Sequence, residues 1–423
     1  MSAHYKNRIL ELSEKLIEIQ RPIQILEAVK WPEGVEEAFL KTSFKEIPKF
    51  SYEQKPLKYN TQKKLEEFKL FRQEINRELG ESDPVAKMLI NNCLEYENVV
   101  RMLMSRGQPD FYDYSKKLYG SSYDLITNQN KSLHEFSSTI LSTLSNLDLN
   151  NFGDSLTKNY RSEDVVSELN RRLGPYFYGE KIKVKLSDGI LSDAAAGSDY
   201  IKIKENLMFS KKDIDIFEVH EGWVHLGTTL NGKKQEYAKF LSKGSPRSTV
   251  IQEGLAVIME LFNFAMFPAR AKRLTNRIVA TKMAEDGANI LEVISFYREL
   301  GQTNEQALKN ASRIFRGACL HGGSPFTKDL SYLKGFLQVY EFMKTSVSKG
   351  QGELIPFLFY GKVSLEEIEL LRSLKEQNII SEAPYIPDQI RDLSGLAVWL
   401  TLTDFLKAQS KTDNEERKTL KAA

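Results

Sequence analysis

The chain has 423 residues, of which 41% are hydrophobic and 27% are charged. These proportions are typical of a soluble globular protein, and the length suits one large domain or two joined units. The 59 basic and 57 acidic residues nearly cancel, so the overall charge gives no reason to expect a nucleic-acid or anionic-membrane partner. No stretch approaches about 20 consecutive apolar residues, which excludes a membrane-spanning helix.

The cysteines and the amino-terminal residues indicate a cytoplasmic protein. Cys93 and Cys319 are far apart in the sequence, so a cysteine-based zinc site or a thioredoxin-like motif is excluded. So few thiols in a chain of this length suit a reducing cytoplasm. Residues 1–20 carry charges every few positions and therefore lack the apolar core of a signal peptide.

Apolar residues at three- and four-residue steps predict a helical amino-terminal region over residues 1–150. Residues 31–60 contain three prolines and little periodicity, and we expect them to form an extended connector. Asp83 followed by Pro84 is a typical helix start, because aspartate caps the first turn and proline fits the first helical position. The expected helices end at Pro22, cover 65–79, run from Asp83 to before Gly107, and cover about 131–146.

Residues 151–423 are expected to form a second region that packs with the first as one compact unit. Ile182, Val184 and Leu186 alternate with lysines, which predicts a half-buried strand at a sheet edge. Helical patterns fill most of the rest, so the predicted fold class is α+β, predominantly α-helical with a small sheet. Further expectations are a strand at 200–203, a proline-rich break at 383–387 and a frayed tail after Gln409.

Two of the five histidines fall within six residues, in the run His220-Glu221-Gly222-Trp223-Val224-His225. Ser210 and Asp213 form a capping-box helix start just before it, so the imidazoles are expected on a largely apolar, buried helix. A buried imidazole needs a partner, and a metal ion is one such partner. Purely structural histidine pairs are also common, so the spacing alone leaves both interpretations open.

The spacing of this pair differs from the familiar His-Glu-x-x-His motif, in which histidines four residues apart share one helix face. His220 and His225 are five residues apart, which on an ideal α-helix would separate them by roughly 140°. A single-turn π-bulge absorbs one extra residue, and such bulges favour functional sites. We therefore expect a local distortion of the helix near Gly222.

A third metal ligand is expected on a different helix, because catalytic zinc typically takes three protein ligands and leaves one position for water. Thr249 and Gln252 have capping-box spacing, which predicts a helix start near Thr249. Gln252 would then be engaged in the cap, and Glu253 would be free to project. Glu260 lies roughly on the same face and is the reserve ligand or a hydrogen-bond partner of a ligand.

Glu221, beside the first histidine, suits the role of a general base that takes a proton from a metal-activated water. Two alternatives stay open. Two histidines and a carboxylate also form the facial triad of iron-dependent oxidoreductases, although such an enzyme has no evident need for the Glu221 base. The same residues would also fit a non-catalytic interaction or regulatory protein with a vestigial site.

Gln252-Glu253-Gly254-Leu255-Ala256 resembles the QEGLA signature of bacterial flavohaemoglobin-expression-modulating proteins, which are related to the microtubule-associated tyrosine carboxypeptidases. The resemblance extends to the His-Glu-x-x-x-His run at 220–225. It implies a zinc metallopeptidase with a zincin-like catalytic core. It also implies one zinc ion per chain, held by His220, His225 and Glu253, with Glu221 as the general base. Further runs that are similar to the family lie at 316–317, 322–323 and 326–333.

The resemblance also implies a carboxypeptidase, because the eukaryotic members remove a carboxy-terminal tyrosine from tubulin. The expected substrate is therefore a peptide or protein C-terminus, with tyrosine or another aromatic residue as the leaving residue. A carboxypeptidase needs a cation for the terminal carboxylate, and Arg313, Arg316 and Lys328 are the candidates. Tyr332 or His321 would donate a hydrogen bond to the developing oxyanion.

Overall fold

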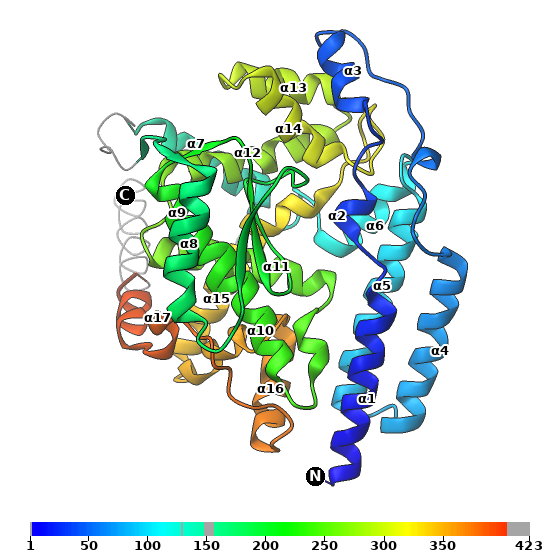
Figure 1. Ribbon diagram of the computed structural model, residues 1–423, viewed down its shortest axis with the longest axis vertical. Coiled ribbons are helices and arrows are strands. Elements are labelled where there is room, and N and C mark those ends of the chain that lie inside the picture. The colour runs from blue at the N-terminus through cyan, green and yellow to red at the C-terminus, as the bar shows by residue number, and fades with distance from the viewer. Residues whose placement is uncertain (1, 128–129, 148–155, 404–423) are drawn as a thin grey trace, which may run out of the picture.

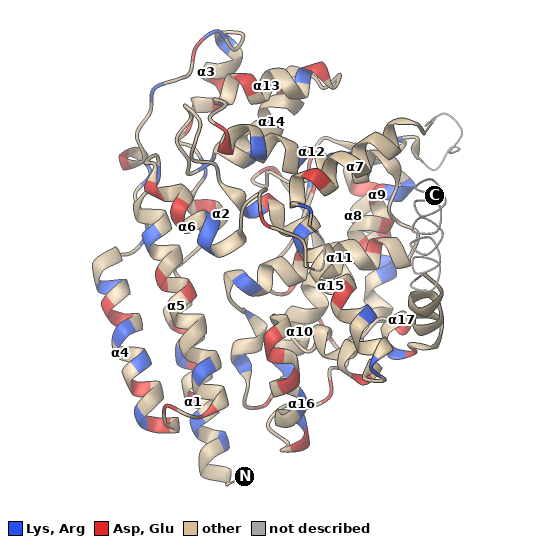
Figure 2. Ribbon diagram, turned by 180° about the vertical axis from the view of Figure 1, so that it is seen from behind, with Lys and Arg blue, Asp and Glu red and all other residues tan. Residues whose placement is uncertain are grey.

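The computed structural model describes residues 2–127, 130–147 and 156–403. Helices α1, α4 and α5 form a column along one side of the molecule, and α11 and α15 lie in its middle (Figure 1). Acidic and basic residues alternate along α4 and α5 rather than gathering by sign (Figure 2), in keeping with the nearly balanced composition. Helices make up most of the described chain, as the sequence predicted.

The four helices expected in the amino-terminal region are present as α1, α4, α5 and α7. Asp83 caps α5 as predicted, since its carboxylate accepts a hydrogen bond from the Ala86 N–H at 2.9 Å. The expectation of an extended connector over 31–60 was wrong in part, because Phe39 packs on Trp31 and residues around it are helical. The amino-terminal elements are α1 Ala3–Gln20, α2 Ile25–Ala28, α3 Val35–Lys41, η1 Tyr52–Gln54, α4 Thr61–Leu79, α5 Pro84–Met104, α6 Asp110–Tyr119 and α7 Leu133–Ser145.

Two small sheets follow. Both predicted strands are present and pair in parallel, with Val184 opposite Ile201. The first of them lies at a sheet edge, as its lysines indicated. The third strand of this sheet, β3, was not expected, because Ala-Ala-Ala carries no alternating pattern. The strands are β1 Tyr160–Arg161, β2 Lys183–Ser187, β3 Ala194–Ala196, β4 Tyr200–Lys204 and β5 Met208–Phe209, in the orders β1-β5 and β2-β4-β3.

Helical segments fill most of the remaining described chain, and the proline-rich break at 383–387 is present. The tail after Gln409 lies outside the described residues. No helix in the described ranges is long and apolar enough to cross a membrane. The segments are α8 Ser162–Tyr176, α9 Lys211–Phe217, η4 Glu218–Leu226, α10 Gly227–Lys234, η5 Lys239–Ser242, α11 Pro246–Phe262, α12 Pro268–Glu285, α13 Ile290–Glu299, α14 Asn304–Phe315, η6 Thr327–Leu330, α15 Ser331–Ser348, η7 Gly352–Phe359, η8 Leu365–Glu367, α16 Ile368–Glu376 and α17 Asp388–Arg391.

The amino-terminal column and the middle of the molecule share one hydrophobic core. Buried side chains of α1, α4 and α5, such as Leu12, Phe71 and Leu89, belong to the same cluster as Leu255 of α11 and Val339 of α15. Burial of each such side chain stabilises the fold by roughly 1.5–3 kcal/mol. The column therefore supports α11 from one side.

Helices α11 and α15 touch backbone to backbone at two glycines. A Cβ atom on Gly254 would lie 2.0 Å from the carbonyl carbon of Gly335. A Cβ atom on Gly335 would lie 1.9 Å from the carbonyl oxygen of Val250. Neither position can hold a side chain unless the helices separate, because the interior is close-packed. The contact places the start of α15 beside the middle of α11.

We expect Gly254→Ala to lower the free energy of unfolding by about 1–3 kcal/mol, because an added methyl group overpacks this contact. Thermal unfolding of the purified variant measures the change. Gly395, in the helical segment 394–403, is the matched control, because a Cβ atom there would meet nothing within 4 Å. Gly395→Ala should leave stability unchanged or raise it by up to about 1 kcal/mol. An unchanged melting temperature in Gly254→Ala would contradict the close contact.

Candidate metal centre

The segment that carries both histidines is a π-helix. In η4 the hydrogen bonds run from each N–H to the carbonyl five residues earlier, as from Gly227 to Gly222. The predicted distortion is confirmed, although it extends over nine residues rather than a single turn. The wider turn brings the rings of His220 and His225 together, with centroids 4.7 Å apart and planes at 85°.

Contacts with α8 hold this π-helix in place. A Cβ atom on Gly222 would lie 2.6 Å from Leu173 of α8, so glycine permits the close approach of the two segments. Arg172, also on α8, binds Asp215 at 2.8 Å and Glu218 at 2.9 Å. These ion pairs join α8 to the end of α9 and the first residue of η4. The register of the histidine-bearing turn is therefore set by packing as well as by its own hydrogen bonds.

Glu253 of α11 completes a cluster of three side chains that could hold a metal ion. Its Oε2 lies 3.4 Å from His220 Nε2 and 3.5 Å from His225 Nε2. Two ligand atoms that are each about 2.1 Å from a tetrahedral zinc ion lie about 3.4 Å apart, so these separations fit zinc. Glu253 Oε2 is buried and has no hydrogen-bond partner. Such an oxygen is costly to bury, and a cation between it and the two imidazoles would satisfy it.

The expected start of α11 was wrong. The helix begins at Pro246 and not near Thr249, so Glu253 lies in the helix interior rather than in its first turn. Proline at the first helical position accounts for the earlier start. Gln252 is not engaged in a cap; its Oε1 accepts a hydrogen bond from Thr228 Oγ1 at 2.7 Å. The spacing of a capping box therefore arose here inside a helix.

Glu260 fixes the orientation of His220. Its Oε1 lies 2.7 Å from His220 Nδ1, which leaves Nε2 directed at Glu253. Arg270 binds both oxygens of Glu260, at 2.8 and 3.2 Å. Glu260 is thus bonded to His220 and is not one of the three clustered side chains. Such partners set the tautomer and the direction of a metal-binding imidazole.

The charges of the cluster are strongly coupled. Burial by itself would lower the pKa of His220, but the carboxylates of Glu253 and Glu260 outweigh it and raise that pKa to about 10. Burial lowers the pKa of His225. Burial opposes the ionisation of Glu253 too, but the charge of Lys328 and the two imidazoles hold its pKa well below the usual range. Without a metal ion, the site therefore holds an ionised Glu253 and a charged His220.

Glu221 is half-buried and is held beside the cluster by β3. Its Oε2 accepts a hydrogen bond from the Ala196 N–H at 2.8 Å. The unexpected third strand thus supplies a backbone donor that orients this carboxylate. Because Glu221 directly follows His220 in the chain, it lies next to the metal-binding groups without being one of them.

Two of the three cations expected to bind substrate are already paired. Lys328 Nζ lies 2.9 Å from Glu253 Oε1. The guanidinium of Arg313 binds both oxygens of Asp329, at 2.5 and 2.9 Å. Arg316 is buried as well, but its Nε has no hydrogen-bond partner. Among these three candidates, Arg316 is the one with an unsatisfied donor.

Sequence reasoning missed a further buried cation, Arg277 of α12. Its Cζ lies 5.0 Å from the centre of the Tyr332 ring, which is stacked on His220 at 6.1 Å. Its Nε and Nη1 have no hydrogen-bond partner, although Nε lies 3.6 Å from Asp329. His321, by contrast, is exposed. The signal that could have revealed the cation is a run of arginines at three- and four-residue steps: Arg270, Arg273 and Arg277.

A family model described as microtubule-associated tyrosine carboxypeptidase matches residues 37–408. The matched range includes all three residues of the metal cluster and Glu221. The chain belongs to the microtubule-associated tyrosine carboxypeptidase family. The resemblance drawn from the motifs at 220–225 and 252–256 is therefore confirmed.

Comparisons with individual proteins add little to the family. No curated protein matches the chain. A Colwellia psychrerythraea protein, whose crystal structure was described as that of a lipoprotein, is similar with a TM-score of 0.45 and 12% identity. The similarity covers 81% of this chain and 72% of that one. A likeness this distant carries no argument about function.

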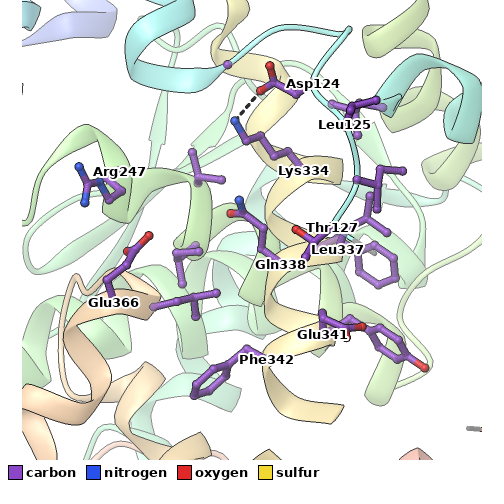
Figure 3. Close-up of a pocket in the computed structure, with 18 of the residues that line it drawn as sticks. Asp124, Leu125, Thr127, Arg247, Lys334, Leu337, Gln338, Glu341, Phe342 and Glu366 are labelled. Atoms are coloured by element: carbon purple, nitrogen blue, oxygen red, sulfur yellow. Dashed lines mark hydrogen bonds and ion pairs between the residues drawn. The ribbon is translucent and has the colours of Figure 1, made fainter. Parts of the chain in front are cut away.

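In this member of the family, a large cavity lies apart from the metal cluster. It has a volume of about 2350 Å³, and none of the metal-cluster side chains lines it. Figure 3 shows Lys334 of α15 pointing toward Asp124, with their charged atoms 2.7 Å apart, and Arg247 and Glu366 at one side of the cavity. The chemistry of the donor atoms, rather than the size of the cavity, therefore locates the candidate site.

We expect zinc binding at pH 7 to release about one proton per chain, because a metal ligand must be a neutral imidazole. The metal-free pKa of His220 is about 10, so its charged form dominates at pH 7 and zinc must displace the proton. Zinc affinity should accordingly rise with pH up to about 10. Calorimetric titrations in two buffers with different ionisation enthalpies measure the release. A heat that does not depend on the buffer would contradict this prediction, and His321→Gln, at an exposed position outside the cluster, is the control in which the release is unchanged.

Proposed function

We propose that this family member is a zinc-dependent carboxypeptidase that removes the last residue of a peptide or protein. The observation that carries the proposal is the arrangement of His220, His225 and Glu253, whose ligand atoms have separations that suit one zinc ion per chain. The name of the family supports a C-terminus as substrate, with tyrosine as the expected leaving residue. The π-helix that carries two ligands and the strand beside Glu221 support a zincin-like catalytic core.

The adjacent carboxylate supports hydrolysis over the alternative of iron-dependent oxidation. Zinc, when bound here, would lower the pKa of a water molecule to about 7 and polarise the scissile carbonyl. Glu221 would take a proton from that water and deliver it to the departing amine. The Ala196 N–H, which binds Glu221 Oε2 at 2.8 Å, would keep this carboxylate in position through both transfers. Glu260 would keep His220 oriented throughout.

Glu221→Gln should lose peptide hydrolysis by about 10²–10⁴-fold, because the amide cannot accept the proton, while one zinc ion per chain is retained. Digestion of a peptide library with mass-spectrometric readout of the C-termini measures activity, and elemental analysis measures metal. Glu14→Gln is the control, since it makes the same change at an exposed position of α1, outside the metal cluster.

Full activity of Glu221→Gln would exclude this role for the carboxylate. Wild-type protein that binds no zinc would remove the basis of the proposal. Iron in place of zinc after anaerobic purification would favour the oxidoreductase.

A cluster of buried charges beside the metal centre would bind the terminal carboxylate of the substrate. Arg277, Arg313 and Arg316 lie around one acid, Asp329, and all four side chains are at least nine-tenths buried. Arg313 occupies both carboxylate oxygens. Buried positive charge in excess of its counter-ions is unfavourable, so this cluster would gain from an anion. Burial lowers the pKa of Arg316 to about 10, and the nearby Arg313 adds to the effect.

Within this cluster we assign the carboxylate to Arg277 and Arg316. Both have donors without a hydrogen-bond partner, whereas Lys328 and Arg313 are held by Glu253 and Asp329. The Tyr332 ring is close to both groups. The Cζ of Arg277 lies 5.0 Å from its centre, and the centre of the His220 ring lies 6.1 Å away. A carboxylate bound by Arg277 would therefore place the last peptide bond near the metal cluster. We keep Tyr332 as the donor to the developing oxyanion, the role proposed from the sequence.

Arg277→Gln should weaken the preference for a free C-terminal carboxylate over an amide, because only Arg316 then remains to bind the carboxylate. The wild type should bind the peptide with a free carboxylate with a Kd about 10–100-fold lower than that of the amide, because a charge-assisted hydrogen bond contributes about 1.5–3 kcal/mol. Binding of both peptides is measured calorimetrically in the Glu221→Gln background, where no turnover occurs. Arg273→Gln removes the same charge from the same helix, and Arg273 pairs instead with Asp193 at 3.7 Å. An equal loss in that control, or an unchanged preference in Arg277→Gln, would exclude the assignment.

A further inference from the structure

Lys362 forms hydrogen bonds to three elements close to the metal cluster. Its Nζ donates hydrogen bonds to the carbonyl oxygen of His225 at 2.8 Å, to Gln252 Oε1 at 2.8 Å and to Thr228 Oγ1 at 3.0 Å. An ammonium group has three hydrogens and no acceptor, so these three partners use its full capacity. The three elements are η4, α11 and α10, in that order.

Of these partners, one is a residue of the metal cluster and another directly precedes one. His225 is itself a member of the cluster, and Gln252 directly precedes Glu253. Thr228 Oγ1 also lies 2.7 Å from Gln252 Oε1, and its single hydrogen is shared between that oxygen and the carbonyl oxygen of Val224. The hydrogen bonds therefore link the backbone of one ligand to the neighbour of another.

Several side-chain donors gather at the junction between η4 and α10. Threonine hydroxyls in helices often bind the carbonyl four residues earlier. Side-chain hydroxyls of Thr228 and Thr229 bind the carbonyls of Val224 and His225, at 2.6 and 2.8 Å. Lys362 adds a further hydrogen bond to the second of these carbonyls, at 2.8 Å.

The backbone of Lys362 is fixed as well. Its N–H donates to the carbonyl oxygen of Leu241 at 2.7 Å. A Cβ atom on the preceding Gly361 would lie 2.6 Å from the same residue, so the chain is pressed against η5 at this point. The side chain of Lys362 thus extends to η4 and α11 from a backbone that is packed against η5.

We propose that Lys362 is a positioning residue for the metal centre: together with Gln252 it sets the separation of His225 and Glu253. This inference rests on the proposed metal centre and not on the identity of the substrate. A purely structural lysine would stabilise the zinc-free and zinc-bound protein equally. A positioning residue stabilises the geometry that zinc selects, so its loss lowers the affinity for zinc and changes the coordination geometry.

Lys362→Met keeps the length of the side chain and removes the three hydrogen bonds, and Gln252→Met removes their acceptor on α11 without a change of charge. Zinc dissociation constants are measured by competition with a chromophoric chelator, and the visible spectrum of the cobalt-substituted protein reports the coordination geometry. We expect both variants to bind zinc about 10–100-fold more weakly, the usual effect of losing an outer partner of a ligand, with altered cobalt spectra. Removal of a positive charge alone would tighten zinc binding, so weaker binding by Lys362→Met reports lost geometry.

Lys243→Met is the matched control, because Lys243 lies on the nearby segment after η5 and contacts none of the metal-binding side chains. It should bind zinc as the wild type does. Wild-type zinc affinity and cobalt spectra in Lys362→Met and Gln252→Met, with or without a lower melting temperature, would overturn the proposal. If Lys362→Met does not fold, Gln252→Met decides alone. Because every readout is metal binding, a wild type that binds zinc but cleaves no peptide leaves this test intact and affects only the proposed function.

Discussion

The i→i−5 hydrogen bonding of η4 is the constraint on which the proposed metal centre depends. Five residues separate His220 from His225, and a regular α-helix would direct their side chains to different faces. A π-helix is seldom stable by itself, so neighbouring elements must support it. Gly222 and Leu173 provide contact with α8, and Lys362 binds a carbonyl where the wide turn ends. The unusual histidine spacing and the unusual backbone are therefore two aspects of one arrangement.

The centre also depends on buried charges that are matched by the fold. A buried carboxylate without a counter-ion costs several kcal/mol, yet the described residues bury three of them around the histidines. Each has a cation at hydrogen-bond distance, and two of these pairs are bidentate, which adds direction to the attraction. The pairs are Glu253 with Lys328, Glu260 with Arg270, and Asp329 with Arg313. The carboxylates are thus held ionised and oriented.

The glycine contact between α11 and α15 connects these charges to the hydrophobic core. Gly254 follows Glu253 directly, and its contact with Gly335 brings the amino-terminal part of α15 beside the ligand. Tyr332 and the preceding Lys328 thereby lie next to His220 and Glu253. A larger residue at either glycine would move the cation and the aromatic ring away from the cluster. Packing density and electrostatics in this protein consequently constrain the same few positions.

The sequence by itself determined the features whose causes are local. The five-residue spacing predicted a distorted helix, Asp83-Pro84 predicted a helix start, and alternation at 182–186 predicted a strand, because each depends on hydrogen bonds or periodicity within a few residues. Only the tertiary structure decided which distant groups meet. The Ala196 N–H binds Glu221 from β3, a strand with no alternating pattern, and Arg277 of α12 lies against Tyr332 of α15. Such contacts follow from how helices and strands pack, and packing is determined by the whole chain at once.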